Sequence, residues 1–309
     1  MNPRHPRLRK VAHVVFAVFL AAVLVLLVRA ARSIDWSGVA AAVTGYGPRT
    51  LTIAAVLTLL SYLVHCGYDL AARRYAHHAL STPRVMVIAF ISYAFSLNIG
   101  ALIGGTGFRF RLYAYSGLGV GPTSRVVAFS VSANWLGYLL LTGALFAAHG
   151  TPLPQQWNVG ASGMQAFGLA MLATLIAYLI ACRLSHGRVF HIRGRHFRFP
   201  TLPLAIAQVV LATLNWAIMA AIVYVLLPDT IAYSIVLGTL LVAAIASALA
   251  HIPAGIGVIE AVFIALLGHT VPPAHLLAAL LAFRAIYYLV PLLIAVGLYV
   301  AFEARGRLG

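Results

Sequence analysis

Apolar residues fill most of the chain in long blocks separated by short polar stretches, and these blocks predict helices that cross a membrane. One crossing needs about 20 mostly apolar residues. The uninterrupted blocks cover residues 11–28, 51–68, 126–148, 164–182, 202–227 and 275–301. The first block follows a basic start like that of a signal peptide, but its apolar run exceeds the usual length of a signal-peptide core. We expect an uncleaved first span.

Two further apolar blocks are broken by glycine-rich sequence. Residues 85–123 are interrupted near 98–107, and residues 231–268 are interrupted by the run from His251 to Gly257. Irregular backbone is tolerated at membrane depth only where protein or water shields it. We therefore expect a re-entrant hairpin in each block, although for 231–268 the number of crossings alone does not separate a hairpin from two complete spans.

The pattern as a whole predicts an all-α polytopic membrane protein with six complete spans and two broken hairpins. All of it belongs to one transmembrane domain, 1–309, whose first half is 1–148 and whose second half is 164–309. Two hairpins at similar places in the halves, entering from opposite sides, would fit an inverted repeat. No self-similarity between the halves is visible in the sequence.

Composition and charge strengthen this interpretation. Hydrophobic residues make up 62% of the chain and charged residues 8%, far below the roughly 25% of soluble domains. With a cytoplasmic N-terminus, 17 of the 21 basic residues fall on the cytoplasmic side and only Arg29, Arg32 and Arg49 fall outside. This is the positive-inside distribution. We expect cytoplasmic termini and anionic lipid headgroups as partners, and no nucleic acid.

The first broken block carries one group of candidate binding residues. Its glycines would let the backbone approach a ligand and could expose N–H groups to an anion. The arginines that follow match phosphate geometry through two nitrogens each. An ordinary interfacial turn whose arginines reach lipid headgroups is the open alternative. The candidates are Gly104, Gly105, Gly107, Arg109, Arg111 and Tyr113.

The second broken block and the last span carry the other group. Glu260 is the only acid deep in an apolar run, with 30 uncharged residues before it and 23 after it. Arg284 in the last span is its expected partner, with Tyr288 one turn further on the same face. Gly255 and Gly257 could shape a half-helix whose N-terminus faces an anion. A purely structural ion pair is the alternative.

Other features predict less chemistry. We expect Asp69 to pair with Arg73 one turn later, and Cys66 and Cys182 to be buried apolar residues. No ligand spacing predicts a metal, no motif predicts a cofactor, and no catalytic arrangement or nucleotide-binding loop is present. We expect no enzyme activity, and transport that is downhill, ion-coupled or driven by a partner.

The two broken blocks resemble the hallmark segments of the lysylphosphatidylglycerol synthase transmembrane region, in residues 104–113 and 251–260. That family includes the flippase half of MprF-type proteins and stand-alone YbhN-like inner-membrane proteins. The resemblance implies phospholipid movement between the leaflets of a bacterial inner membrane, with roles for Arg109, Arg111, Glu260 and Arg284. The chain ends at Gly309, shortly after the last span, so we do not expect the lipid aminoacylation of the full-length enzymes.

The sequence leaves two alternatives to a phospholipid flippase. One is a non-transporting membrane subunit that organises or recruits a lipid-synthesis enzyme through its basic loop 183–198. The other is a small-solute or ion transporter. A homo-oligomer or a lipid-synthesis enzyme is the protein partner that the sequence leaves open. Headgroup specificity, direction and energy source do not follow from the residues.

Overall fold

The fold is described from a computed structural model in which residues 36–148, 161–185, 189–192, 195–228, 230–250, 252 and 255–306 are placed. The predicted first span, 11–28, lies outside the described residues. Within them, seven helices are long and apolar enough to cross a membrane. The chain is therefore a polytopic helical membrane protein, as the sequence predicts.

The long helices coincide with the predicted uninterrupted spans. They are α3 (Pro48–Ala76), α6 (Val120–Ala147), α7 (Ala161–Ser185), α8 (Leu202–Leu226) and the continuous run formed by α11 (Pro273–Phe283), a π-helical segment (Arg284–Leu289) and α12 (Val290–Gly306). A short helix, α2 (Trp36–Thr44), precedes α3. The described residues also contain one short antiparallel hairpin, β1 (Val189–Ile192) with β2 (Arg195–Arg198), which the all-α prediction did not include.

Each broken block forms two helical arms joined by a break. In the first, α4 (Thr82–Ile99) is followed by a π-helical segment (Ala101–Gly107) and α5 (Phe108–Tyr115). In the second, α9 (Tyr233–Ala250) is followed by α10 (Val258–Leu267). The ten residues of α10 extend only about 15 Å, half the thickness of the hydrocarbon layer. That length favours a hairpin for residues 231–268. The topology of six complete spans plus two hairpins stays a prediction, as does the inverted repeat.

Proline and glycine set the ends of these elements. Proline occupies the first turn of α3, α4, α8 and α11, where its missing N–H costs no helical hydrogen bond. Gly100 ends α4 with φ +101°, and Gly257 precedes α10 with φ +80°. Both values lie in a region that residues with a Cβ rarely occupy. The two breaks therefore follow from the local sequence.

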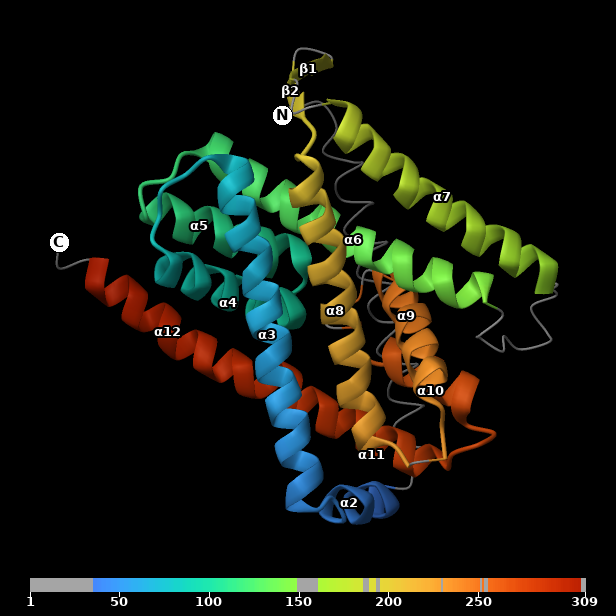
Figure 1. Ribbon diagram of the computed structural model, residues 1–309. Coiled ribbons are helices and arrows are strands. Elements are labelled where there is room, and N and C mark those ends of the chain that lie inside the picture. Colours follow the sequence, from blue (N-terminus) through green and yellow to red (C-terminus); the bar gives the residue numbers. More distant parts are fainter. Residues whose placement is uncertain are drawn as a thin grey trace, which may run out of the picture.

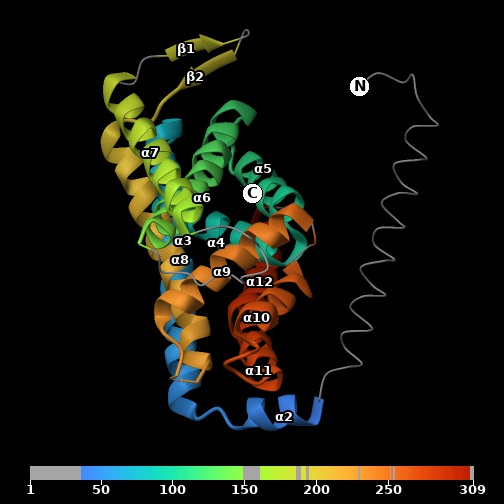
Figure 2. The ribbon, with the colours of Figure 1, turned by 90° about the vertical axis from the view of Figure 1, so that its right-hand side faces the viewer.

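The two hairpins enter the molecule from opposite ends. Arg73 Nη1 near the end of α3 lies 3.0 Å from Thr82 Oγ1 at the start of α4. At the other end, Tyr46 Oη before α3 donates to the Leu226 carbonyl at the end of α8 (2.8 Å), and α9 begins shortly afterwards. Figure 1 shows α4 and α5 on one side of the α3–α8 pair and α9 and α10 on the other. Figure 2 shows β1–β2 and α2 at the two extremes of the molecule.

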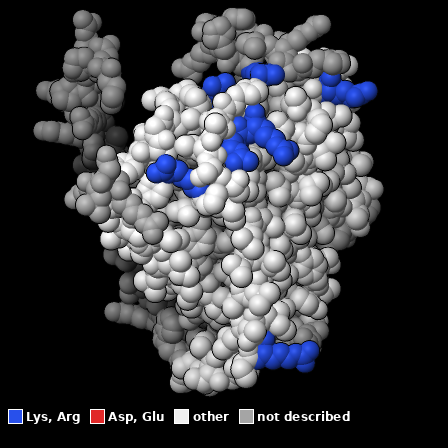
Figure 3. All heavy atoms as spheres, turned by 60° about the vertical axis from the view of Figure 1, so that its left-hand side comes forward, with Lys and Arg blue, Asp and Glu red and all other residues white. Residues whose placement is uncertain are grey.

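One end of the molecule is rich in arginine, and we call it the basic end. It is the end at which α3 and α7 finish and α4, α6 and α8 begin. Figure 3 shows the Lys and Arg side chains of one face gathered toward this end, with a further group at the opposite end. By the positive-inside rule the basic end would be cytoplasmic. Its described arginines are Arg73, Arg74, Arg84, Arg111, Arg125, Arg183 and Arg198.

Small residues bring the long helices close together. A Cβ on Gly137 of α6 would lie 2.5 Å from Ala212 Cβ of α8, and one on Gly168 of α7 would lie 2.8 Å from the Gly143 carbonyl of α6. Such close crossings are the usual source of packing energy between helices in lipid. Large apolar side chains remain exposed on the outside of the helices, which suits a surface covered by acyl chains.

Candidate functional site

An ion pair between Asp69 on α3 and Arg109 on α5 holds the first hairpin against the long helices. Arg109 Nη2 lies 3.0 Å from Asp69 Oδ1, and Arg109 Nε lies 3.0 Å from Oδ2. Both side chains are buried, with Asp69 0% and Arg109 7% exposed. A charge at such depth is stable only when a well-oriented partner offsets its loss of water.

Two hydroxyl groups complete the surroundings of the Asp69 carboxylate. Tyr113 Oη donates to Oδ2 at 3.0 Å, and Ser130 Oγ of α6 donates to Oδ1 at 2.9 Å. The carboxylate therefore accepts hydrogen bonds from α5 and α6 together. A buried polar network in which every member is satisfied is rigid, so we regard this pair as the anchor of the first hairpin.

The predicted pair between Asp69 and Arg73 is wrong. Arg73 Nη1 instead donates to the Leu80 carbonyl (3.2 Å) and to Thr82 Oγ1 (3.0 Å). Asp69 faces the interior of the bundle, where Arg109 also lies, while Arg73 extends to the polar end of α3. Helix spacing alone could not foresee this, because Arg109 lies 40 residues further along the chain.

A second ion pair joins Glu260 on α10 to Arg284 at the start of the π-helical segment before α12. Arg284 Nε lies 2.7 Å from Glu260 Oε1, and Arg284 Nη2 lies 3.2 Å from Oε2. The predicted contact between these residues is confirmed. The Tyr288 ring centroid lies 5.5 Å from Arg284 Cζ, on the side that the sequence predicted. Both charged side chains are 16% exposed, so this pair is less enclosed than the first.

The break before α10 binds the second pair through its backbone. The Gly257 N–H donates to Glu260 Oε2 at 2.8 Å, and the Gly255 carbonyl accepts from Arg284 Nη2 at 3.2 Å. The N-terminus of α10 is capped by the chain's own Glu260, so the role of Gly255 and Gly257 toward a ligand anion stays a prediction. Gly255 has φ +58°, and a Cβ on it would lie 2.6 Å from Ser247 Oγ of α9.

The glycines of the first hairpin allow close packing. A Cβ on Gly104 would lie 2.1 Å from the Phe95 carbonyl oxygen, and one on Gly105 would lie 2.7 Å from Ser96 Oγ. Their N–H groups donate to the Gly100 carbonyl, so they are not open to an anion. Glycine at these positions lets the returning arm lie directly against α4.

A cavity of about 400 Å³ lies between the two hairpins. Gly105 and Arg109 line it from the first hairpin, and Gly255 and Ile259 from the second. Tyr288, whose ring lies against Arg284, also lines it. Arg109 of the first pair therefore faces the cavity directly, and the second pair contacts two of its lining residues, Gly255 and Tyr288. The volume falls in the range of about 300–1,000 Å³ that is usual for small-ligand sites. The tips of both broken blocks therefore meet at one partly polar cavity, as a binding site requires.

A buried polar cluster supports the wall of this cavity. Tyr287 Oη lies 2.7 Å from both Ser61 Oγ and Tyr93 Oη, and Ser61 Oγ donates to Asn215 Oδ1 at 2.8 Å. The His65 ring stacks on Tyr93 with centroids 3.4 Å apart and faces the cavity. Sequence reasoning missed this cluster, because single hydroxyl groups on apolar helices do not show which neighbour they meet.

Of the predicted site residues, Gly105, Arg109, Gly255 and Tyr288 line the cavity, and Gly107 and Arg111 are among those that do not. Arg111 is exposed at the basic end, where its Cζ lies 5.5 Å from the Tyr299 ring centroid. Gly107 is exposed, and a Cβ on it would meet nothing closer than the Leu102 carbonyl at 3.9 Å. Arg109 and Arg111 therefore do not form one phosphate clamp: the former is buried in an ion pair, and the latter faces the headgroup region.

One signal in the sequence marks Asp69 as a candidate partner for a buried arginine, although it does not say which arginine. Asp69 is the only acid between residues 36 and 228, and a buried arginine needs an acidic partner. Each acid whose side chain the structure describes, Asp69 and Glu260, pairs with an arginine, and each pair includes one residue of a broken hairpin.

Fold and site together define a class: helical membrane proteins in which two broken hairpins from opposite ends enclose a charged cavity. The family profile for the lysylphosphatidylglycerol synthase TM region matches residues 14–295. The chain belongs to that family.

Two similar proteins give the same assignment. The inner membrane protein YbhN of Escherichia coli is 40% identical over 308 residues, which is 99% of this chain and 97% of the relative. An uncharacterized protein of Synechocystis is 30% identical over 262 residues, covering 83% of this chain and 80% of the relative. The similarity to each extends over most of both sequences.

Proposed function

We propose that this protein moves phospholipids between the leaflets of a bacterial inner membrane, with the headgroup passing through the cavity between the hairpins. The observation that carries the proposal is the contact of the Glu260–Arg284 pair with two residues that line that cavity, Gly255 and Tyr288. Membership of a lipid-related family supports the lipid as cargo. The role is one of transport, without catalysis, cofactor or metal.

The second ion pair offers both charges that a zwitterionic headgroup needs. A phosphate would take the place of the Glu260 carboxylate at Arg284, whose planar group binds phosphate through two nitrogens. An amine would in turn bind the released Glu260. Because these side chains are partly exposed, exchanging partners costs less desolvation than it would at Asp69. The resting pair thus holds the site closed until a headgroup competes for it.

The first hairpin provides the fixed wall. Asp69 holds Arg109 in place, and Arg109 adds a positive group to the cavity surface without leaving its partner. Leu97, Val131 and Leu240 supply apolar lining, against which the glycerol backbone of a lipid could lie. The acyl chains would stay in the bilayer while the headgroup crosses.

Reconstitution tests the proposal directly. Full-length protein in liposomes should speed the leaflet exchange of a fluorescent phospholipid, measured by the fraction that an external reductant bleaches. Glu260→Gln and Arg284→Gln should each slow the protein-dependent rate by at least about tenfold, which corresponds to about 1.4 kcal/mol. Arg125→Gln, which removes an exposed charge from the second turn of α6, should leave the rate unchanged.

Three results would contradict the proposal. Folded wild-type protein that exchanges lipid no faster than empty liposomes would favour a non-transporting subunit. Solute or ion flux without lipid exchange would favour a small-solute transporter. Full activity of Glu260→Gln would remove the second pair from the mechanism even if lipid exchange is real.

A further inference from the structure

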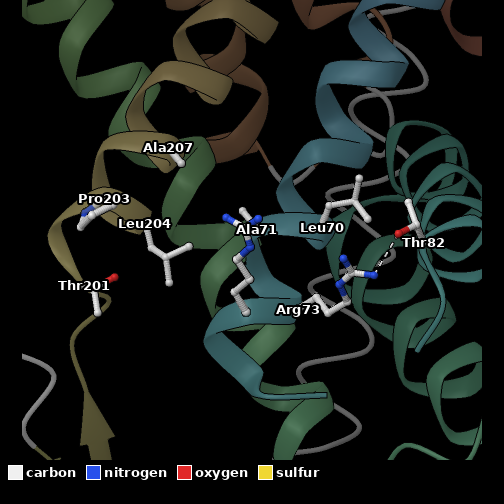
Figure 4. A pocket seen from close by; sticks show the side chains of 9 residues that line it. Leu70, Ala71, Arg73, Thr82, Thr201, Pro203, Leu204 and Ala207 are labelled. Atoms are coloured by element: carbon white, nitrogen blue, oxygen red, sulfur yellow. Dashed lines mark hydrogen bonds between the residues drawn. The ribbon is translucent and has the colours of Figure 1, made fainter. Parts of the chain in front are cut away.

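A second cavity lies at the basic end, outside the space between the hairpins. It has a volume of about 610 Å³ and is formed where α3 ends, α8 begins and α4 begins. Figure 4 shows Thr201, which precedes α8, and Pro203 and Leu204 of α8 across from Leu70 and Ala71 of α3, with Arg73 and Thr82 beyond them. We call it the α3–α8 groove. It shares no lining residue with the central cavity.

We propose that the α3–α8 groove binds one phospholipid with an anionic headgroup from the leaflet at the basic end. The groove is charged at one side and apolar at the other. Arg73 and Arg74 supply the charge, Leu204 and Ala207 supply part of the apolar surface, and none of the described residues that line the groove is Asp or Glu. This pairing of arginines with an apolar surface is complementary to a lipid phosphate and the start of its acyl chains.

The depth of the groove suits a headgroup. The 29 residues of α3 extend about 44 Å, well beyond the 30 Å hydrocarbon layer. Arg73 and Arg74 lie in the last turn of α3, before His77 ends the helix with φ +55°. They therefore lie at the level of lipid phosphates, where each interfacial arginine attracts an anionic lipid.

The arginines have binding capacity left for a phosphate. Arg74 is exposed and makes no hydrogen bond or ion pair with any residue in the described part of the chain. Arg73 uses only Nη1, for the Leu80 carbonyl and Thr82 Oγ1. Those two bonds hold its side chain at the groove. A phosphate could accept from Arg74 and from the remaining nitrogens of Arg73, and arginine forks suit that geometry.

The apolar side of the groove continues toward the middle of the molecule. On α3, Leu63 lies seven residues before Leu70 and is 46% exposed. On α8, Val210 lies three residues after Ala207 and is 56% exposed. These spacings place each residue on the same helix face as its counterpart in the groove. An acyl chain leaving the groove would therefore follow an apolar track along α3 and α8.

Binding of phosphatidylglycerol to the full chain in detergent, titrated by native mass spectrometry, tests this inference. Phosphatidylcholine with the same acyl chains serves as the zwitterionic comparison. Wild-type protein should bind the first phosphatidylglycerol more tightly than the first phosphatidylcholine. Arg74→Gln should weaken phosphatidylglycerol binding about fivefold, the effect expected of one interfacial arginine. Arg73→Gln combined with Arg74→Gln should weaken it further.

Matched controls separate the groove from general surface charge. Arg125→Gln at the same end and Arg49→Gln at the opposite end remove exposed charges outside the groove, and both should bind like wild type. Ala207→Phe fills the apolar side and should weaken both lipids. Arg73 also bonds within the protein, so Arg74→Gln, which breaks no such bond, decides the outcome if the double variant misfolds.

Two outcomes would overturn the inference. One is equal affinity of the wild-type protein for the two lipids. The other is a loss of phosphatidylglycerol affinity in Arg125→Gln or Arg49→Gln as large as the loss in Arg74→Gln. The assay measures binding and not exchange, so its result is independent of the proposed function. Groove binding without leaflet exchange would leave this site standing and remove the flippase proposal.

Discussion

The two ion pairs differ in how completely protein surrounds them. Asp69 accepts hydrogen bonds from Arg109, Tyr113 and Ser130 and has no exposed surface. Glu260 and Arg284 are each 16% exposed and rest partly on the backbone of a glycine-rich break. The first arrangement suits an anchor, because moving either charge would leave the other buried alone. The second suits a contact that a ligand can open.

The hairpins also carry opposite charges. The first supplies the cation, Arg109, to an acid on a long helix, and the second supplies the anion, Glu260, to an arginine on the last helix. The cavity between the hairpins therefore has Arg109 of an enclosed pair in its wall, while the more exposed second pair lies behind Gly255 and Tyr288. This asymmetry would be hidden if the two halves were treated as equivalent repeats.

The largest expected effect separates the two pairs by stability. Asp69→Asn should lower the free energy of unfolding by about 3–5 kcal/mol, because it leaves Arg109 charged and buried. Glu260→Gln should cost about 1.5 kcal/mol, since Arg284 keeps its hydrogen bond to the Gly255 carbonyl and is partly exposed. Thermal unfolding in detergent measures both.

A paired change checks the cause of the Asp69 effect. Replacing Asp69 by Leu together with Arg109 by Met removes both buried charges and should recover most of the stability lost in Asp69→Asn. Equal losses in Asp69→Asn and Glu260→Gln would show that the second pair is as enclosed as the first, which would contradict the distinction drawn between them.

A smaller effect concerns the fit of the first hairpin. Gly104→Ala should destabilise the protein by about 1–3 kcal/mol, because the new Cβ meets the Phe95 carbonyl and the two arms must separate. Gly107→Ala, in the same π-helical segment but with open space around it, is the control and should be close to neutral. Unfolding midpoints of the two variants are compared. A neutral Gly104→Ala would mean that the arms are not packed at this point.

The smallest effect is a pH dependence beside the first pair. His78 lies between α3 and α4, with its ring centroid 5.7 Å from that of Tyr113. Burial lowers the pKa of His78 below its ordinary value of 6.5, the charge of Arg73 lowers this pKa further, and Asp69 opposes the change. The folded protein thus binds the proton less tightly than the unfolded chain. The free energy of unfolding should be highest above the ordinary histidine pKa and should decrease as the pH drops below it.

The measurement is the unfolding midpoint at about pH 7.5 and about pH 5.5, on either side of the ordinary histidine pKa. His78→Gln should reduce the decrease in the unfolding midpoint between these two pH values, since glutamine does not titrate. An unchanged fall would show that the surroundings of Tyr113 are hydrated at the basic end, so the anchor would be less enclosed than the geometry indicates.

The sequence by itself determined the membrane class, the positions of the long helices and both breaks, because these depend on apolar run length and on local glycine and proline. It also predicted the Glu260–Arg284 contact, since Glu260 is isolated in a long apolar run and has few possible partners. Tertiary structure alone decided that Asp69 pairs with Arg109 and not Arg73, that Gly104 packs against Phe95, and that Arg111 lies away from the cavity. Those outcomes depend on which helix faces meet, and helices of nearly uniform apolar composition do not encode their facing sides in any local pattern.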